Sequence, residues 1–87
     1  MIVPKFIIAK QLGGKKVISN HGEEIGRLMD ATIDTDTGRL LAILVRPSGE
    51  TRLYKVLEKT EDGLLVIPFK AVVAISDVVV VDETQLA

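Results

Sequence analysis

The chain has 87 residues, of which 11 are basic and 12 acidic, and 47% are hydrophobic. This length supports one small domain with its own core, and so high an apolar fraction excludes a disordered chain. The net charge of −1 gives no electrostatic basis for binding nucleic acid or an anionic membrane surface. With no cysteine, the chain has no disulfide, thiolate nucleophile or Cys-based metal site, and it fits the reducing cytoplasm.

The N-terminal segment, residues 1–13, has a short apolar centre that stands between two lysines. Its apolar residues are Phe6, Ile7, Ile8 and Ala9. So short a run forms neither the core of a signal peptide nor a membrane span, and charges interrupt the later apolar runs, so we expect no membrane insertion. We expect an edge strand over residues 3–8 and one helical turn over residues 9–12, which ends at a glycine pair.

The central stretch, residues 22–46, predicts two long antiparallel strands joined by a tight turn. In the first strand polar and apolar side chains alternate, and the predicted inward set is Ile25, Met29, Ala31 and Ile33. The turn is Asp36-Thr37-Gly38, because aspartate can hydrogen-bond to nearby backbone and glycine accepts a positive φ. The return strand is apolar on both faces over Leu40–Val45, so we expect both faces to be covered.

The remaining elements are short. Lys15–Ser19 is predicted as a strand before the hairpin, and three strands are predicted after it: Leu64–Ile67, Val72–Ile75 and Val78–Val81. Residues 51–61 show both helical and alternating spacing, and we expect a short helix or irregular structure there. The sequence therefore predicts an all-β fold, a small barrel or sandwich of five to seven short strands with one or two short helical turns.

Several short motifs occur along the chain in a characteristic order. They are Gly14–Ile18, Gly22–Gly26, Asp34–Arg39, Ile67–Phe69, and the run of Val72, Ile75, Asp77 and Val78–Val81. This ordered set resembles the PRC-barrel family, and the Ile-Pro-Phe corner with the run after it is its most specific part. The resemblance implies a small PRC-type β-barrel over residues 14–82, after an N-terminal segment of residues 1–13 and before a polar tail of residues 83–87.

The resemblance also implies an interaction module and not an enzyme. Family members include the cytoplasmic part of the photosynthetic reaction-centre H subunit and the C-terminal domain of a ribosome-maturation factor. Others are stand-alone archaeal proteins implicated in FtsZ-based cell division through the membrane anchor SepF. This chain is most similar to the stand-alone group, because we expect neither a membrane helix nor a second domain in it. The implied function is a cytoplasmic adaptor with a SepF-like division protein as one partner, and the alternative is an RNA- or ribosome-associated module.

The polar residues show no pattern of a metal or catalytic site. A calcium loop that begins at Asp34 would need a ligand where Gly38 stands and a glutamate where Val45 stands. The one histidine, His21, lies in a turn signal and has no partner of triad or zinc spacing, so we expect an exposed turn residue. Instead, Asp34 and Asp36 are expected to be hairpin-turn residues. As a set, the carboxylates on the outer face of the hairpin are expected to be solubilising charges: Glu23, Glu24, Asp30, Asp34 and Asp36. We predict no enzymatic activity, no cofactor and no metal.

RNA binding has weak support in the sequence. Single-stranded RNA sites stack bases on aromatic rings beside basic residues. Of the three aromatic residues, only Tyr54 has basic neighbours, Arg52 and Lys55. The sequence therefore argues against a nucleic-acid partner, which we keep as the alternative.

The apolar excess is the positive signal for an interface. Leu40–Val45 and Val78–Val81 are apolar on both faces, whereas only one face of a strand can point into a barrel. The second face is covered either by residues 3–8 or 51–59 of the same chain, or by a second copy or another partner. We predict self-association, as a homodimer or with a paralogous PRC-barrel protein. The candidate interface residues are Phe6, Ile7, Ile8, Val78, Val79, Val80 and Val81.

Overall fold

The computed structural model describes residues 14–49 and 52–86, and seven strands within these ranges form one sheet. The strands are β1 (Lys16–Ser19), β2 (Glu24–Ile33), β3 (Leu40–Pro47), β4 (Glu58–Lys59), β5 (Leu65–Pro68), β6 (Val72–Ile75) and β7 (Val78–Val81). Three 3-10 turns accompany them: η1 (Arg52–Lys55), η2 (Phe69–Ala71) and η3 (Glu83–Gln85). The predicted all-β fold is confirmed, and β6 and β7 have the predicted bounds.

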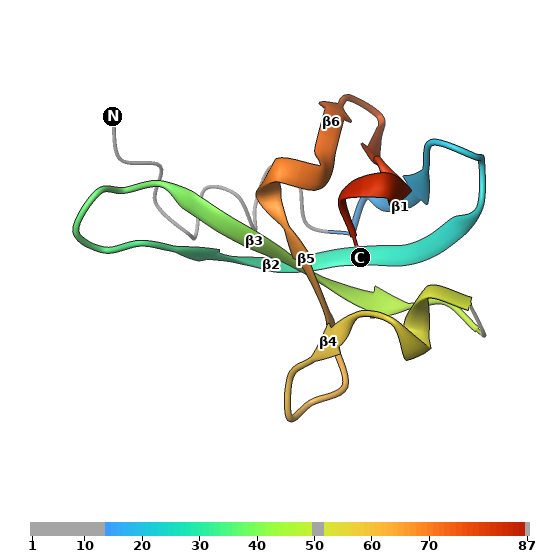
Figure 1. Ribbon diagram of the computed structural model, residues 1–87, viewed down its shortest axis with the longest axis horizontal. Coiled ribbons are helices and arrows are strands. Elements are labelled where there is room, and N and C mark those ends of the chain that lie inside the picture. Colours follow the sequence, from blue (N-terminus) through green and yellow to red (C-terminus); the bar gives the residue numbers. More distant parts are fainter. Residues whose placement is uncertain (1–13, 50–51, 87) are drawn as a thin grey trace.

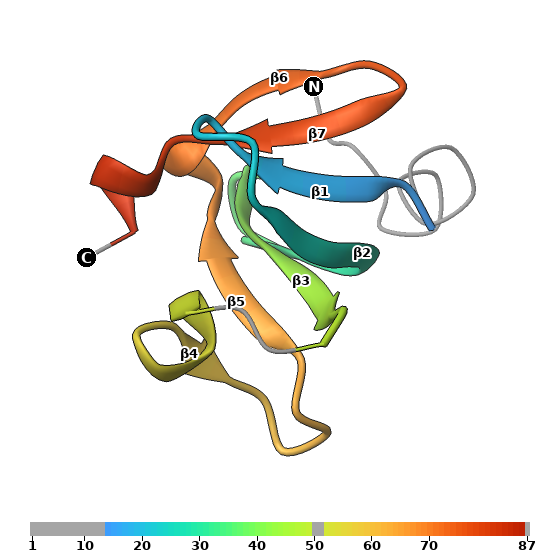
Figure 2. The ribbon, with the colours of Figure 1, turned by 90° about the vertical axis from the view of Figure 1, so that its right-hand side faces the viewer.

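The strand order brings the first and last strands of the described chain together. The order is β4-β5-β3-β2-β1-β7-β6, with β4 and β6 at its two ends. All neighbouring strands are antiparallel except β1 and β7, which run parallel. Figure 2 shows how the sheet curls, with β6 and β7 on one side of the arc and β5 and β4 on the other. This curl makes the small β-barrel that the motifs implied.

One hydrophobic core fills the barrel. Its fully buried apolar side chains include Val17, Ile25, Leu28, Val45, Leu65, Ile67, Val79 and Val81. Three leucines from outside the strands join this cluster: Leu53 and Leu57 from the η1 region and Leu86 after η3. Residues 51–61 were expected to form a helix or irregular structure, and the described part forms η1 and the two-residue β4. Each fully buried aliphatic side chain contributes about 1.5–3 kcal/mol, so these leucines matter to stability.

A β-bulge in β2 makes one of the predicted inward residues wrong. Leu28 pairs with Val45 and Asp30 with Leu44, so Met29 is an extra residue without a partner on β3. A bulge shifts the alternation of side chains by one position. Met29 is therefore 40% exposed, and Leu28 takes its place in the core with 1% exposure. The alternation in the sequence could not reveal this insertion.

The outer end of β3 contradicts the prediction that both faces of this strand are covered. Only residues Ala42–Val45 of β3 are paired with β5. Beyond Ala42 the β2–β3 hairpin projects past the other described strands, as Figure 1 shows. Leu41 lies in this projecting part and is 54% exposed, whereas Ile43 and Val45 are buried. The side chains of β3 are therefore covered only as far as Ala42, which pairs with Pro68 at the end of β5.

The hairpin turn is held by Asp34 and not by Asp36. The Asp34 carboxylate accepts hydrogen bonds from the backbone N–H groups of Asp36 (2.9 Å) and Thr37 (3.4 Å). Gly38 has a φ of 74° and donates its N–H to the Asp34 carbonyl at 2.7 Å. The predicted need for glycine at this position is confirmed, and of the two aspartates predicted as turn residues it is Asp34 whose carboxylate accepts the turn N–H groups.

Replacement of Gly26 by alanine should destabilise the fold strongly. A Cβ atom at Gly26 would clash with the backbone carbonyl of Arg46 on the neighbouring strand, and backbone atoms within a sheet cannot move aside. We expect a loss of about 3 kcal/mol or more, measured by denaturant unfolding. Gly22→Ala is the control: its Cβ meets open space, and its φ of 85° alone costs about 1 kcal/mol. Equal losses in the two variants would contradict the close approach of β2 and β3.

The turn assignment predicts that Asp34→Ala destabilises more than Asp36→Ala. Asp34→Ala removes the acceptor of two backbone N–H groups and should cost about 0.5–1.5 kcal/mol. Asp36→Ala keeps the Asp36 N–H that Asp34 binds, so its cost should be smaller. Thermal melts with and without calcium measure both effects, and calcium should leave the melting temperatures unchanged. A calcium-dependent rise in the parent that Asp34→Ala abolishes would show a metal site instead.

Candidate interaction surfaces

The two groups of predicted interface residues lie in different parts of the chain. The N-terminal group, Phe6–Ile8, lies outside the described residues, so its role stays a prediction. In β7 the side chains alternate between the two faces. Val79 and Val81 are buried in the core with 1% and 0% exposure, whereas Val78 and Val80 are half-buried on the opposite face. Of the β7 group, only Val78 and Val80 therefore reach the outer surface.

The strand β6 forms an apolar edge of the sheet, which we call the β6 edge (Val72–Ile75). Val73 is 58% exposed and Ile75 is 41% exposed. An apolar row on the outer face runs onto the neighbouring strands, because Ala74 pairs with Val80 and Val80 pairs with Ile18. Ile75 pairs with the buried Val79 and therefore lies on the other face. The predicted apolar excess on the outer face of β7 thus extends across β6, β7 and β1.

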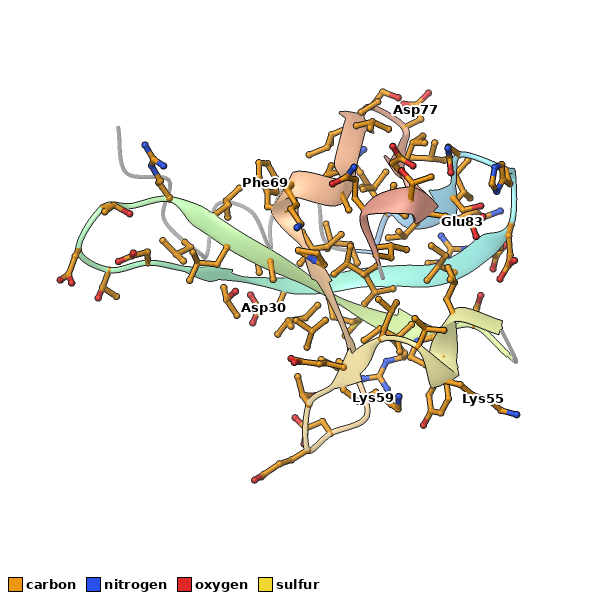
Figure 3. The ribbon with its side chains drawn as sticks, viewed as in Figure 1. Asp30, Lys55, Lys59, Phe69, Asp77 and Glu83 are labelled. Atoms are coloured by element: carbon orange, nitrogen blue, oxygen red, sulfur yellow. The ribbon has the colours of Figure 1, made fainter. Side chains whose placement is uncertain are left out.

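A second apolar surface lies where the β2–β3 hairpin projects past β5. An open hollow there, which we call the hairpin groove, is lined by Gly38, Arg39, Leu40, Leu41, Pro68, Phe69 and Lys70. Phe69, the first residue of η2 (Figure 3), is half-buried and packs against the core while it also lines the groove. Arg39 and Lys70 are both exposed, so this end of the groove carries two positive charges.

The hairpin groove continues into a second hollow, with which it shares Leu41 and Pro68. The other residues that line this hollow are Ala42, Val56, Leu57, Glu58, Val66 and Leu86. Val56 is 59% exposed here, although its spacing from Leu53 and Leu57 predicted the same face of a helix. Glu58 gives this end a negative charge. The continuous surface therefore has an apolar floor, a basic end and an acidic end.

The polar residues considered in the sequence do not assemble into a metal site. His21 is an exposed turn residue, as predicted, and its Nδ1 atom lies 2.8 Å from Oε2 of Glu83. In residues 14–49 and 52–86 no group of three or more His, Cys, Asp or Glu side chains could hold a metal ion. The helices of these ranges are 3-10 turns of three or four residues, and none of them could cross a membrane.

Tyr54, the aromatic residue considered for RNA stacking, contacts a lysine of its own chain. The Nζ atom of Lys59 lies 4.5 Å from the centre of the Tyr54 ring. The same ammonium donates hydrogen bonds to the carbonyl oxygens of Tyr54 (2.5 Å) and Leu57 (2.9 Å). Figure 3 shows Lys55 and Lys59 near η1 and β4. A base-stacking site would need a free face of the Tyr54 ring and a nearby cation. Lys59 covers one face of this ring, and its ammonium is already hydrogen-bonded within the chain.

The turn between β1 and β2 is hydrogen-bonded to the C-terminal turn. Asn20 donates its N–H to the Val81 carbonyl at 2.8 Å, and its Oδ1 accepts the N–H of Glu83 at 3.1 Å. Asp82 Oδ1 accepts from the hydroxyl of Thr84 at 2.8 Å and from its N–H at 2.9 Å. Because these bonds favour the carboxylate, they hold the pKa of Asp82 below its ordinary value.

Comparison with known proteins supplies the family. The family model of the PRC-barrel domain matches residues 4–87, almost the whole chain. An uncharacterized protein of Methanocaldococcus jannaschii is 40% identical over 79 residues, which cover 90% of this chain and 83% of the relative. The chain therefore belongs to the PRC-barrel family, which confirms the resemblance of its motifs. A PRC-barrel domain is a small binding-type module, and this agrees with the two exposed apolar surfaces.

The lowered pKa of Asp82 predicts a loss of stability in acid. A carboxyl whose pKa is lower in the folded state stabilises the fold above its unfolded pKa, and this contribution disappears as the pH falls through the folded pKa. The melting temperature of the parent should therefore fall below about pH 4. Asp82→Asn should reduce this pH dependence. Thr84→Ala should reduce it too, because the Thr84 hydroxyl is one of the donors.

Thermal melts followed by circular dichroism, from neutral pH to about pH 2, measure this effect. Glu24 should supply part of the dependence that remains, because a hydrogen bond from Ser48 and the charge of Lys16 lower its pKa as well. The same pH dependence in the parent and in both variants would contradict the role of Asp82.

Proposed function

We propose that this protein is a non-enzymatic adaptor that binds an apolar segment of a partner protein in the hairpin groove and also self-associates. The observation that carries the proposal is the 54% exposure of Leu41 within a groove whose floor is otherwise formed by Leu40, Pro68 and Phe69. A contiguous apolar surface is typical of an interface, whereas single exposed apolar residues are common on any protein.

The energetics of burial support an occupant for this groove. An aliphatic side chain that becomes fully buried contributes about 1.5–3 kcal/mol. Leu41 and Val56 are the exposed large apolar side chains of the two joined hollows, so a partner that buries them would bind more tightly. A few such anchors supply most of the affinity of a protein interface, and the polar rim around them supplies its specificity.

The charges at the ends of the groove define the chemistry of the partner. Arg39 and Lys70 mark one end and Glu58 the other. A complementary segment has two or more aliphatic side chains next to an acidic residue, so that its carboxylate lies near Arg39 and Lys70 and its aliphatic groups cover Leu41. Such charge matching fixes the direction of binding and suppresses other partners.

We further propose that the partner belongs to a cell-division assembly in the cytoplasm, either a SepF-like protein or a paralogous PRC-barrel protein. The support is the likeness of the chain to stand-alone archaeal members of the family. The relative from Methanocaldococcus jannaschii, matched over 83% of its length, agrees with such a small member of the family. The cytoplasmic location is supported by the absence of cysteine.

The experiment is a titration of purified partners against the chain and two matched variants. The partners are a SepF-like protein and a paralogous PRC-barrel protein from the same organism, and polyuridine represents single-stranded RNA. Leu41→Glu should weaken protein binding at least tenfold, about 1.4 kcal/mol, because it places a charge on the apolar floor. Thr35→Glu, at the exposed hairpin turn, should have no effect.

The salt dependence separates a protein partner from RNA. Binding through an apolar groove changes little with salt, whereas RNA binding weakens steeply as phosphate contacts are screened. Tight and strongly salt-dependent binding of polyuridine, unaffected by Leu41→Glu, would overturn the proposal in favour of the RNA-associated alternative. Failure of both proteins to bind would remove the cell-division role.

A further inference from the structure

Three basic residues lie in one register row across β1, β2 and β3, and we call them the basic row (Lys16, Arg27 and Arg46). Lys16 pairs with Arg27, and Arg27 pairs with Arg46. Figure 2 shows the three strands side by side. Residues opposite each other share a face, and neighbouring strands are about 4.8 Å apart, so the three side chains project from a strip about 10 Å long.

The basic row lies on the outer face of the sheet. Val17 follows Lys16 and Val45 precedes Arg46, and both valines are buried in the core with 0% exposure. Because the side chains of a strand alternate between its two faces, the basic row points away from the core. Arg27 and Arg46 are exposed, and the side chain of Lys16 is 42% exposed.

The charges of the basic row are only partly compensated within the fold. Like charges directly opposite each other destabilise a sheet. The Lys16 ammonium lies 3.4 Å from Oε1 of Glu24, and Nη1 of Arg27 donates a hydrogen bond to the carbonyl oxygen of Gly14 at 3.2 Å. Among the described residues no carboxylate pairs with the Arg46 guanidinium. Three cations thus share one carboxylate, an arrangement that costs stability and gives the fold nothing in return.

We propose that the basic row binds an acidic segment of a partner protein, whose carboxylates pair with Arg27 and Arg46. A guanidinium has five N–H donors, and Arg27 uses only one of its two Nη atoms for Gly14, so both arginines can still bind a carboxylate through two hydrogen bonds. A run of consecutive aspartates or glutamates presents several carboxylates within the 10 Å or so of the row. Such a segment relieves the repulsion between the three cations when it binds.

A nucleic acid fits this surface less well than an acidic protein segment. Single-stranded nucleic acid sites combine cations with aromatic rings on which bases stack, and β1, β2 and β3 contain no aromatic residue. The net charge of −1 also gives the whole protein no long-range attraction for a polyanion. A short run of carboxylates needs only the local positive charge of the basic row.

The basic row is separate from the hairpin groove. The Arg27–Arg46 pair lies toward one end of the β2–β3 ladder, and the Ile33–Leu40 pair lies at the other end, beside the groove. Six residues of β2 separate the two pairs, a distance of about 20 Å along an extended strand. One chain could therefore hold two partners at once. This inference goes beyond the proposed function and does not depend on binding in the groove.

Titration of the full chain at low salt with hexaglutamate, and with hexaglutamine as the uncharged peptide, measures this binding. Arg27→Gln and Arg46→Gln should each weaken hexaglutamate binding about two- to fivefold, as expected for exposed ion pairs. Lys55→Gln is the matched control, because it removes one positive charge from an exposed position on η1 (Figure 3). If Lys55→Gln weakens binding as much as Arg46→Gln, the peptide responds to overall charge and the proposal fails.

A variant that should bind more tightly guards against effects of misfolding. The Glu24 carboxylate next to Lys16 would repel an acidic ligand, so Glu24→Gln should strengthen hexaglutamate binding at least twofold. The glutamine keeps an oxygen that can accept the hydrogen bond from the Ser48 hydroxyl, which the Glu24 carboxylate accepts at 2.7 Å. Unchanged or weaker binding by Glu24→Gln would contradict a site at the basic row.

Thermal melts test whether the arginines serve the fold instead. Arg46→Gln should leave the melting temperature at low salt unchanged or raise it, because it removes repulsion across the strands. A lower melting temperature would show that this guanidinium stabilises the fold, and it would overturn the premise of the proposal.

The remaining outcomes identify the ligand and the site. If polyuridine binds more tightly than hexaglutamate and Arg46→Gln weakens its binding, the ligand is a nucleic acid and the proposal is wrong. If Arg39→Gln, at the hairpin groove, weakens hexaglutamate binding more than Arg46→Gln does, the acidic ligand belongs to the groove. Binding of the groove partner should be the same for Arg46→Gln and the parent, so this inference and the proposed function can fail separately.

Discussion

The parallel pairing of β1 with β7 is the contact on which the rest of the barrel depends. It joins residues 16–19 to residues 78–81, near the two ends of the described chain. Its inward side chains, Val17, Val79 and Val81, are at most 1% exposed. Parallel strands cannot be linked by a short turn, and here the connection between them contains the other described strands, β2 to β6. This single long-range pairing thus turns a series of local antiparallel contacts into one curved sheet around a core.

The exposed surfaces follow from strands of unequal length. β2 has ten residues and β3 has eight, whereas β5, β6 and β7 have four each. The long hairpin must therefore project beyond its neighbours, and the hairpin groove forms at the point where β5 ends. The other surface, the β6 edge, exists because no described strand follows β6 in the sheet order. Both surfaces are consequences of the barrel geometry and need no special segment of the chain.

The exposed apolar surfaces are the structural basis of the binding function that we propose. A PRC-barrel domain whose described residues hold no metal-binding cluster can still act by bringing other proteins together. In the proposal, the exposed apolar side chains of the groove are the anchors for a short segment of another protein, and the charges at its ends set the direction of that segment.

The sequence by itself determined the elements and the family. Alternating apolar residues predicted the strands, turn residues such as Gly38 separated them, and the ordered motifs identified the PRC barrel, because these signals are local. The tertiary structure alone decided which side chains are exposed. The bulge at Met29, the end of β5 that leaves Leu41 open, and the position of β6 at the sheet edge all depend on pairing between distant segments. Such pairing decides which side chains are covered, and the residue pattern of one segment does not specify which distant segment lies beside it or where that segment ends.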